Sequence, residues 1–257
     1  MYQFLLAALI PLLSTPVSAI GPVPAVYKGM EIIDSRGTTL PLEAPLIDSK
    51  GRPRTIGDLM KQGAPLVLTF NYMGCPMLCG LQQDGLAQAI NELELQAGLD
   101  FHIVTVSIDP TESNESIHRA TETMSARVNA DWLVLRGPPE SISELTSAAG
   151  FQYQWVEETQ EFAHPTATYI LTGDGHISQY FTALSPKSRD LNLAIVEAGQ
   201  GKIGSILDQI TLSCLQYDVT SNSYVARDVM QAGGFAIMGG LGLFFALMWR
   251  RDRGRWS

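Results

Sequence analysis

Two cysteines and one distant histidine are the residues of this chain whose types and spacing could do chemistry. Cys75 and Cys79 stand in the segment NYMGCPMLCG, directly after an apolar run and at the expected mouth of a helix. Unpaired amide groups and the helix dipole favour negative charge at a helix N-terminus, so thiolates form more readily there. The thiolate is the form of cysteine that binds a soft metal or attacks a disulfide. The pair is therefore a candidate metal or redox centre.

The spacing of the two cysteines bears on which chemistry they do. If residues 75–79 are already helical, both sulfurs lie on one face of the helix, one turn apart. Three intervening residues, instead of the two of a redox C-x-x-C pair, can spread two sulfurs around a metal. Two thiolates suit Cu(I), and an added imidazole gives a three-coordinate site that also holds Cu(II). The alternative of two buried, inert cysteines is disfavoured because Cys75 lies between Gly74 and Pro76 at the tip of a loop.

His164 is the histidine whose context best completes this set. It precedes Pro165-Thr166 and an expected strand. In thioredoxin-like folds a Pro-Thr step before a late strand packs against the cysteine loop, so His164 is expected to face the two sulfurs. The other histidines are expected to have no role at the site: His102 starts a strand, His118 lies on an exposed helix and His176 lies in a hairpin. The sequence thus predicts a copper site formed by Cys75, Cys79 and His164.

Short apolar runs alternate with helical patterns through the middle of the chain. Strands are expected at 66–71, 101–108, 132–135, 167–171 and 176–181, and helices at 80–97, 112–127, 139–149 and 187–199. The last two strands flank a Gly-Asp-Gly turn and predict a hairpin. Short buried strands covered by helices on both faces favour a parallel or mixed sheet. The predicted fold class is α/β, a thioredoxin-like sandwich over residues 20–200, with an extended segment at its start.

The N-terminal residues 1–19 are typical of a secretory signal. An apolar run at 4–13 is followed by the small residues Val17-Ser18-Ala19, which predict cleavage after Ala19. An uncleaved anchor is the alternative, but about ten apolar residues are too few to cross a bilayer. The soluble domain is therefore expected on the exported side of a membrane, in the periplasm.

The C-terminal residues 232–249 predict a single transmembrane helix. They carry no charge over 18 residues, a length of roughly 27 Å at helical rise, close to the thickness of the bilayer core. The basic tail 250–257 follows directly and is expected to stay cytoplasmic. Residues 201–231 are then a connector between the domain and this anchor. A buried core helix, the alternative, would rarely be apolar on all sides and end in four arginines.

The net charge of the chain is −9, spread unevenly along it. The tail after Trp249 carries +3, so the remainder carries −12. Such an acidic body repels phosphate, which excludes nucleic acid as a partner.

Three segments resemble the SCO/SenC family: GCPMLCG, TVSIDPTES and FAHPTATYILTGDGHISQYF. The resemblance runs from about residue 40 to about residue 200, and the segment around Cys214, Tyr217 and Asp218 is similar to a bacterial branch of that family. It implies a thioredoxin-like copper protein that helps to assemble the copper centre of a respiratory cytochrome oxidase, with Cys75, Cys79 and His164 as ligands. Many members have Asp directly before the histidine, where this chain has Ala163. That difference leaves the copper affinity and the preferred oxidation state open.

Two functions remain open at this point. In the first, the protein is a metallochaperone that passes copper to a subunit of the oxidase, and membrane tethering raises the effective concentration of the pair. In the second, it is an enzyme, a thiol–disulfide oxidoreductase that reduces the acceptor's cysteines, with Cys75 as the attacking thiol. A peroxidase is disfavoured because neither Cys75 nor Cys79 lies in a Thr-x-x-Cys loop. Asp109 is read as a turn former, with a role beside the site as the alternative, and Cys214 as a spare thiol that could pair with another molecule.

Overall fold

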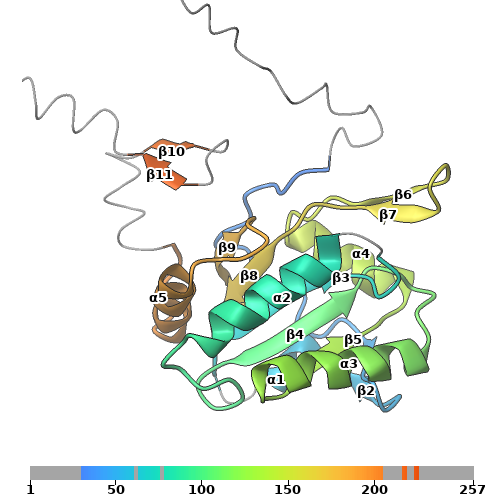
Figure 1. The fold of residues 1–257 in the computed structure, drawn as a ribbon, viewed down its shortest axis with the longest axis horizontal. Coiled ribbons are helices and arrows are strands. Elements are labelled where there is room, and N and C mark those ends of the chain that lie inside the picture. Colours follow the sequence, from blue (N-terminus) through green and yellow to red (C-terminus); the bar gives the residue numbers. More distant parts are fainter. Residues whose placement is uncertain (1–29, 61–62, 76–77, 205–215, 219–222, 226–257) are drawn as a thin grey trace, which may run out of the picture.

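The computed structural model describes residues 30–60, 63–75, 78–204, 216–218 and 223–225 (Figure 1). The predicted signal, the predicted transmembrane helix at 232–249, the basic tail and Cys214 all lie outside these residues. Among the helices that are described, none is both long and apolar enough to cross a membrane.

A mixed sheet of five strands forms the centre of the domain. The strands are β3 (Leu66–Asn71), β4 (His102–Ser107), β5 (Trp132–Leu135), β8 (Thr168–Leu171) and β9 (Ile177–Phe181). Their order across the sheet is β5-β4-β3-β8-β9. Strands β3, β4 and β5 run parallel, whereas β8 is antiparallel to both β3 and β9. Each of these five strands overlaps a predicted one, and the mixed sheet agrees with the sequence-based expectation.

Helices cover both faces of this sheet. They are α1 (Ile56–Leu59), α2 (Leu78–Asn91), α3 (Asn114–Val128), α4 (Pro139–Ala148) and α5 (Ser188–Gly199). Core residues of α1 and α4 pack on one face, and those of α3, α5 and, apart from Cys79, α2 pack on the other. The architecture is therefore the α/β, thioredoxin-like sandwich that was predicted.

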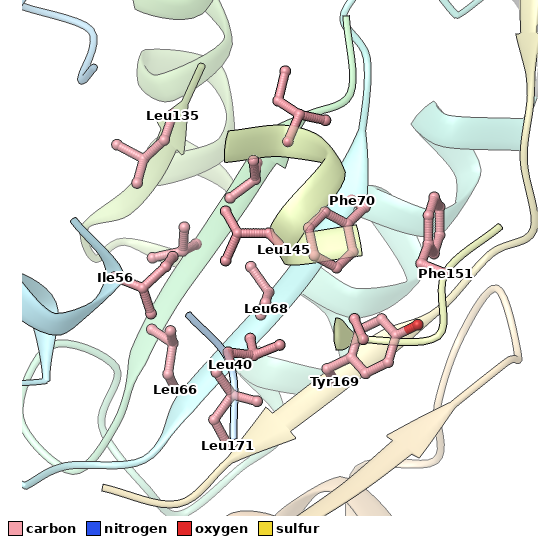
Figure 2. Close-up of a cluster of buried hydrophobic side chains, with 14 of the residues drawn as sticks. Leu40, Ile56, Leu66, Leu68, Phe70, Leu135, Leu145, Phe151, Tyr169 and Leu171 are labelled. Carbon is pink, nitrogen blue, oxygen red and sulfur yellow. The ribbon is translucent and has the colours of Figure 1, made fainter. Parts of the chain in front are cut away.

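The apolar side chains of β3 alternate between the two faces of the sheet, so both faces must be covered by helices. Leu66, Leu68 and Phe70 point into the core under α1 and α4, while Val67 points into the core under α2, α3 and α5. Successive side chains of a strand point to opposite faces of the sheet. Because helices cover both faces, all six residues of β3 are buried. Figure 2 shows the first of these cores, in which Ile56 and Leu145 lie near the β3 side chains.

Local signals fix several element ends. Thr55 and Asp58 form a capping box at the start of α1, Ser113 caps α3, and Pro139 opens α4, where its missing N–H costs nothing. The predicted Gly-Asp-Gly hairpin joins β8 to β9, and Gly175 there has a φ of +89°, in the left-handed region that favours glycine.

Helix α2 differs from its predicted range at both ends. It begins at Leu78 and ends at Asn91, whereas the pattern predicts a helix over 80–97. Leu93 and Leu95 still pack against the core, but they do so from the turns after the helix. Because their spacing is two residues, one helix face cannot bury both.

Three small hairpins were not predicted. They are β1 (Leu46–Ile47) with β2 (Pro53–Arg54), β6 (Gln154–Val156) with β7 (Glu161–Ala163), and β10 (Gln216–Asp218) with β11 (Ser223–Val225). Strands of two or three residues are too short to show a period in the sequence. The β6–β7 hairpin projects from the body of the domain (Figure 1) and leads directly to His164.

The buried position of Leu68 yields a test of the core. Leu68→Ala should lower the free energy of unfolding by about 2–5 kcal/mol, since it removes packed methyl groups and leaves a cavity at a fully buried site. Leu99→Ala makes the same chemical change at a side chain that is 71% exposed, and should change stability by less than about 0.5 kcal/mol. Urea denaturation measures both. Equal losses in the two variants would contradict the arrangement of the core.

Candidate metal centre

Antiparallel pairing of β3 with β8 brings two distant parts of the chain to one edge of the sheet. Thr69 pairs with Thr168, so the end of β3 lies beside the start of β8. The chain leaves β3 toward Cys75 and enters β8 from His164. Residues 85 positions apart in sequence, Cys79 and His164, therefore come into contact.

The two cysteines occupy different local structures. Cys75 precedes α2, and its amide donates to the carbonyl of Tyr72 at 3.4 Å. Cys79 lies in the first turn of the helix and is only 3% exposed. The condition that residues 75–79 be helical throughout is thus not met, because Cys75 itself is not helical.

Cys75 and Cys79 are paired as a disulfide, with their Cα atoms 6.1 Å apart. This Cα separation is within the range that disulfides span. Cys75 is partly exposed, whereas Cys79 is buried. The same pair can therefore exist as a disulfide or, after reduction, as two adjacent thiolates, and Cys75 is the sulfur that is easier to reach.

His164 presents one ring nitrogen to the cysteines. Its Nε2 lies 3.3 Å from Sγ of Cys79, and its Nδ1 lies 2.8 Å from the carbonyl oxygen of Pro165. A carbonyl can only accept, so Nδ1 carries the proton and donates it. In the neutral ring this leaves the lone pair on Nε2, the nitrogen that faces the sulfur.

Burial favours that neutral form. It lowers the pKa of His164 below its usual value, and the hydrogen bond to Pro165 only partly offsets the effect. Tyr72 and Phe151 surround the imidazole, with ring centroids 5.8 and 5.9 Å away. A neutral imidazole is the state that binds a metal, so this environment prepares His164 for ligation.

The two sulfurs and one ring nitrogen all lie within 4.8 Å of one another. Bonds of about 2.0–2.3 Å from S and N to a metal place two ligands of one ion at most roughly 4.6 Å apart. Among the described residues, no other group of three or more His, Cys, Asp or Glu residues converges in this way. Once reduced, the trio offers two soft sulfurs and an imidazole, which fit a copper ion.

The remaining candidates do not join the site. His118 contacts Glu122 on α3, and His176 contacts Asp174 in the β8–β9 turn. Asp109 accepts hydrogen bonds from the amide and the hydroxyl of Thr111, which is the turn-forming role that was expected. Ala163 places an apolar, buried side chain directly before His164.

A buried glutamine that the sequence analysis missed ties the site together. Gln82 is 1% exposed, and its amide nitrogen donates to the carbonyl of Ala167 at 3.0 Å. Its amide oxygen accepts from Asn71 at 3.3 Å. Gln82 therefore links α2, which carries Cys79, to the end of β3 and to the start of β8.

The sequence did contain a signal for Gln82. The residue lies three positions after Cys79 and four before Leu86, and both of these are buried. Polar residues at that spacing lie on the buried face of a helix. A buried polar side chain needs hydrogen-bond partners, although the pattern does not say which.

Glu112 holds the cysteine loop from a second side. Its carboxylate accepts from the amide of Met73 at 2.6 Å. Since Glu112 follows the turn at Asp109, the loop after β4 is coupled to the loop after β3. No pattern in the sequence predicts this contact, which depends on the adjacency of the two parallel strands.

Comparison with protein families identifies the part of the chain that holds this site. The SCO1/SenC family profile matches residues 43–196. A bovine (Bos taurus) relative, the mitochondrial SCO2 homolog, is 27% identical over 146 residues, which cover 53% of this chain and 52% of the relative. The match thus spans about half the length of the curated relatives.

Solved structures share the fold. A candidate electron transfer protein from Aquifex aeolicus VF5 superposes with a TM-score of 0.58 at 24% identity, covering 65% of this chain and 95% of the other. ScoI of Arabidopsis thaliana with copper bound superposes with a TM-score of 0.51 at 20% identity, covering 65% and 99%. At these sequence identities, 24% and 20%, the likeness shows the fold alone.

The Gln82 contacts yield a prediction about stability. Gln82→Leu should lower the free energy of unfolding by about 2 kcal/mol, because Asn71 and the carbonyl of Ala167 lose a buried partner. Gln88→Leu is the matched control on the same helix, where the side chain is exposed, and should shift stability by less than about 0.5 kcal/mol. Chemical denaturation of the two variants checks this. A neutral Gln82→Leu would show that the bonds do not hold the segments together.

Proposed function

The chain belongs to the SCO1/SenC family, and on that basis we propose that it binds copper through Cys75, Cys79 and His164 and delivers it to a respiratory cytochrome oxidase. The observation that carries the proposal is the convergence of two sulfurs and one imidazole within 4.8 Å. The copper held by the structurally similar Arabidopsis ScoI supports the choice of metal.

Reduction of the disulfide is the first requirement of this function. A disulfide sulfur has no thiolate lone pair to give, and the metal ligand is the thiolate. After reduction, Cys75, Cys79 and Nε2 of His164 each contribute one ligand atom. Copper is here the cargo, and three ligands leave it accessible to an acceptor's side chain.

Release then proceeds by ligand exchange. Cys75 is the more exposed sulfur and lies in the loop before α2, while Cys79 is buried in the helix. An incoming thiolate or imidazole of the acceptor replaces Cys75 first, and Cys79 and His164 follow. Stepwise exchange keeps the ion bound throughout, so free copper is not released.

Thiol–disulfide exchange is the second candidate function. The disulfide between Cys75 and Cys79 supports it, because the same pair could reduce the cysteines of an acceptor before copper loading. His164 separates the two candidates: a copper site needs its imidazole as a ligand, whereas exchange between dithiols needs only the sulfurs.

The proposed location of the protein rests on segments outside the described residues. We place the domain on the exported side of a membrane, after removal of the signal at 1–19, with residues 232–249 as the anchor. The support is the composition of these segments alone: an uncharged stretch of 18 residues and four arginines after it.

Copper titration of the reduced protein tests the ligand set. The wild type should bind one copper per chain, and Cys75→Ser, Cys79→Ser and His164→Ala should each weaken binding by more than the roughly 10–100-fold that loss of an outer hydrogen bond costs. His176→Ala is the matched control, since this imidazole lies in the β8–β9 turn. Competition with a Cu(I) chelator measures the affinities. Undiminished copper affinity in His164→Ala would end the copper proposal and favour thiol exchange.

Fractionation of cells that express the chain tests the anchor. The full chain should sediment with membranes and resist extraction at high pH. A chain ending at residue 231 should appear in the soluble exported fraction, because it lacks the 18 uncharged residues. A soluble full-length chain would exclude an anchor at 232–249.

A further inference from the structure

A cavity of about 320 Å³ opens beside the disulfide, between the start of α2 and α3. These two helices lie side by side on the same face of the sheet (Figure 1). Both cysteines line the cavity, together with the polar side chains of Gln83, Ser116, Arg119 and Thr123. Its volume is at the lower end of the range for small-molecule sites.

Of the described residues that line this cavity, one carries a charge, and it is a cation. Arg119 is exposed on α3 and makes no hydrogen bond or ion pair with any described residue. By contrast, Arg127, two turns further along the same helix, bonds to Asp84 at 3.1 Å. On a chain of net charge −9, an unpaired guanidinium next to a disulfide is a local exception that favours an anionic group.

Hydrogen-bond donors accompany the charge. Ser116 and Thr123, which carry hydroxyls, and Gln83, which carries an amide, line the same cavity. Guanidinium, hydroxyl and amide groups together match a carboxylate, which accepts several hydrogen bonds at once. The cavity therefore offers a carboxylate site within reach of the reactive sulfur of Cys75.

From the unpaired Arg119 beside the disulfide we infer that this cavity is the entry site for a small thiol that carries a carboxylate and reduces the Cys75–Cys79 disulfide. Arg119 binds the carboxylate and directs the thiolate toward Cys75. The inference rests on the proposed function, since copper binding requires the reduced pair.

The exchange balances in two steps. The small thiolate attacks Sγ of Cys75, a new S–S bond forms between them, and the bond to Cys79 breaks, with its electron pair left on Sγ of Cys79. A second small thiolate then attacks the sulfur of the first, which releases their disulfide and frees Cys75 as thiolate. Two small thiols are oxidised, and the protein pair is reduced to the form that binds copper.

The environments of the two sulfurs agree with this direction of attack. Cys75 is partly exposed and lines the cavity, so it is the sulfur that is attacked. Cys79 is buried with Nε2 of His164 at 3.3 Å, so the departing thiolate lies against the imidazole that shares the metal site.

Reduction rates with thiols of different charge test the inference on the intact oxidised protein. The probes are 3-mercaptopropionate, 2-mercaptoethanol and 2-mercaptoethylamine, which are negative, neutral and positive. Each rate is divided by the rate of the same thiol with a neutral small disulfide, which removes differences in thiol basicity. The wild type should favour 3-mercaptopropionate over 2-mercaptoethanol by about 3–5-fold at low salt, as expected for one exposed ion pair. High salt should remove the preference.

Three variants identify the residue responsible. Arg119→Gln should abolish the preference and Arg119→Lys should retain most of it. Arg189→Gln removes the same charge from the exposed start of α5 and should leave the preference intact. Absence of a preference in the wild type, or equal loss in Arg119→Gln and Arg189→Gln, would overturn the inference.

Measuring copper affinity in the same variants distinguishes a failure of this inference from a failure of the proposed function. Reduced Arg119→Gln should bind copper as the wild type does, because Arg119 supplies no ligand. If the charge preference is present while no variant of the trio affects copper binding, the copper proposal fails and the thiol site stands. If copper binding behaves as proposed while the charge preference is absent, only the thiol site fails.

Discussion

Strand β3 delivers the chain to the cysteines and strand β8 begins just after His164, and the antiparallel pairing of these two strands is the constraint on which the site depends. Ladder hydrogen bonds fix the register, so the loop leaving one strand must meet the segment entering the other. Buried side chains on both faces of β3 hold that register against slippage. The geometry of the three candidate ligands is thus a consequence of sheet pairing and does not require the loops themselves to be rigid.

Polar contacts hold the candidate ligands in the positions that the strand pairing gives them. Gln82 and Glu112 attach the cysteine loop and the start of α2 to their neighbours, and the Pro165 carbonyl fixes the tautomer of His164. The contacts of Gln82 and Glu112 join segments that are far apart in sequence, so each transmits the position of one element to another. Buried hydrogen bonds of this kind are costly to leave unmade, which gives the site a single preferred arrangement.

In the proposed function, redox chemistry and metal binding share one pair of sulfurs, and they exclude each other at any moment. The disulfide form cannot supply two thiolates, and a copper-loaded pair cannot be reoxidised without losing the ion. If the cavity lined by Arg119 is the entry site inferred above, access to the pair bears on copper loading as much as the ligands do. The asymmetry between an accessible Cys75 and a buried Cys79 serves both chemistries, because each begins at the accessible sulfur.

The sequence by itself determined the main strands and helices, since runs such as 66–71 and 132–135 are apolar enough to be strands in any context. It also singled out Cys75, Cys79 and His164, through the placement of a cysteine pair at a helix mouth and the resemblance to a family. Only the tertiary structure decided where α2 begins, that the β6–β7 hairpin precedes His164, and that Gln82 and Arg119 lie beside the cysteines. The physical reason is that periodicity reports which face of an element is buried, whereas contacts between elements depend on strand order and register, which no local pattern encodes.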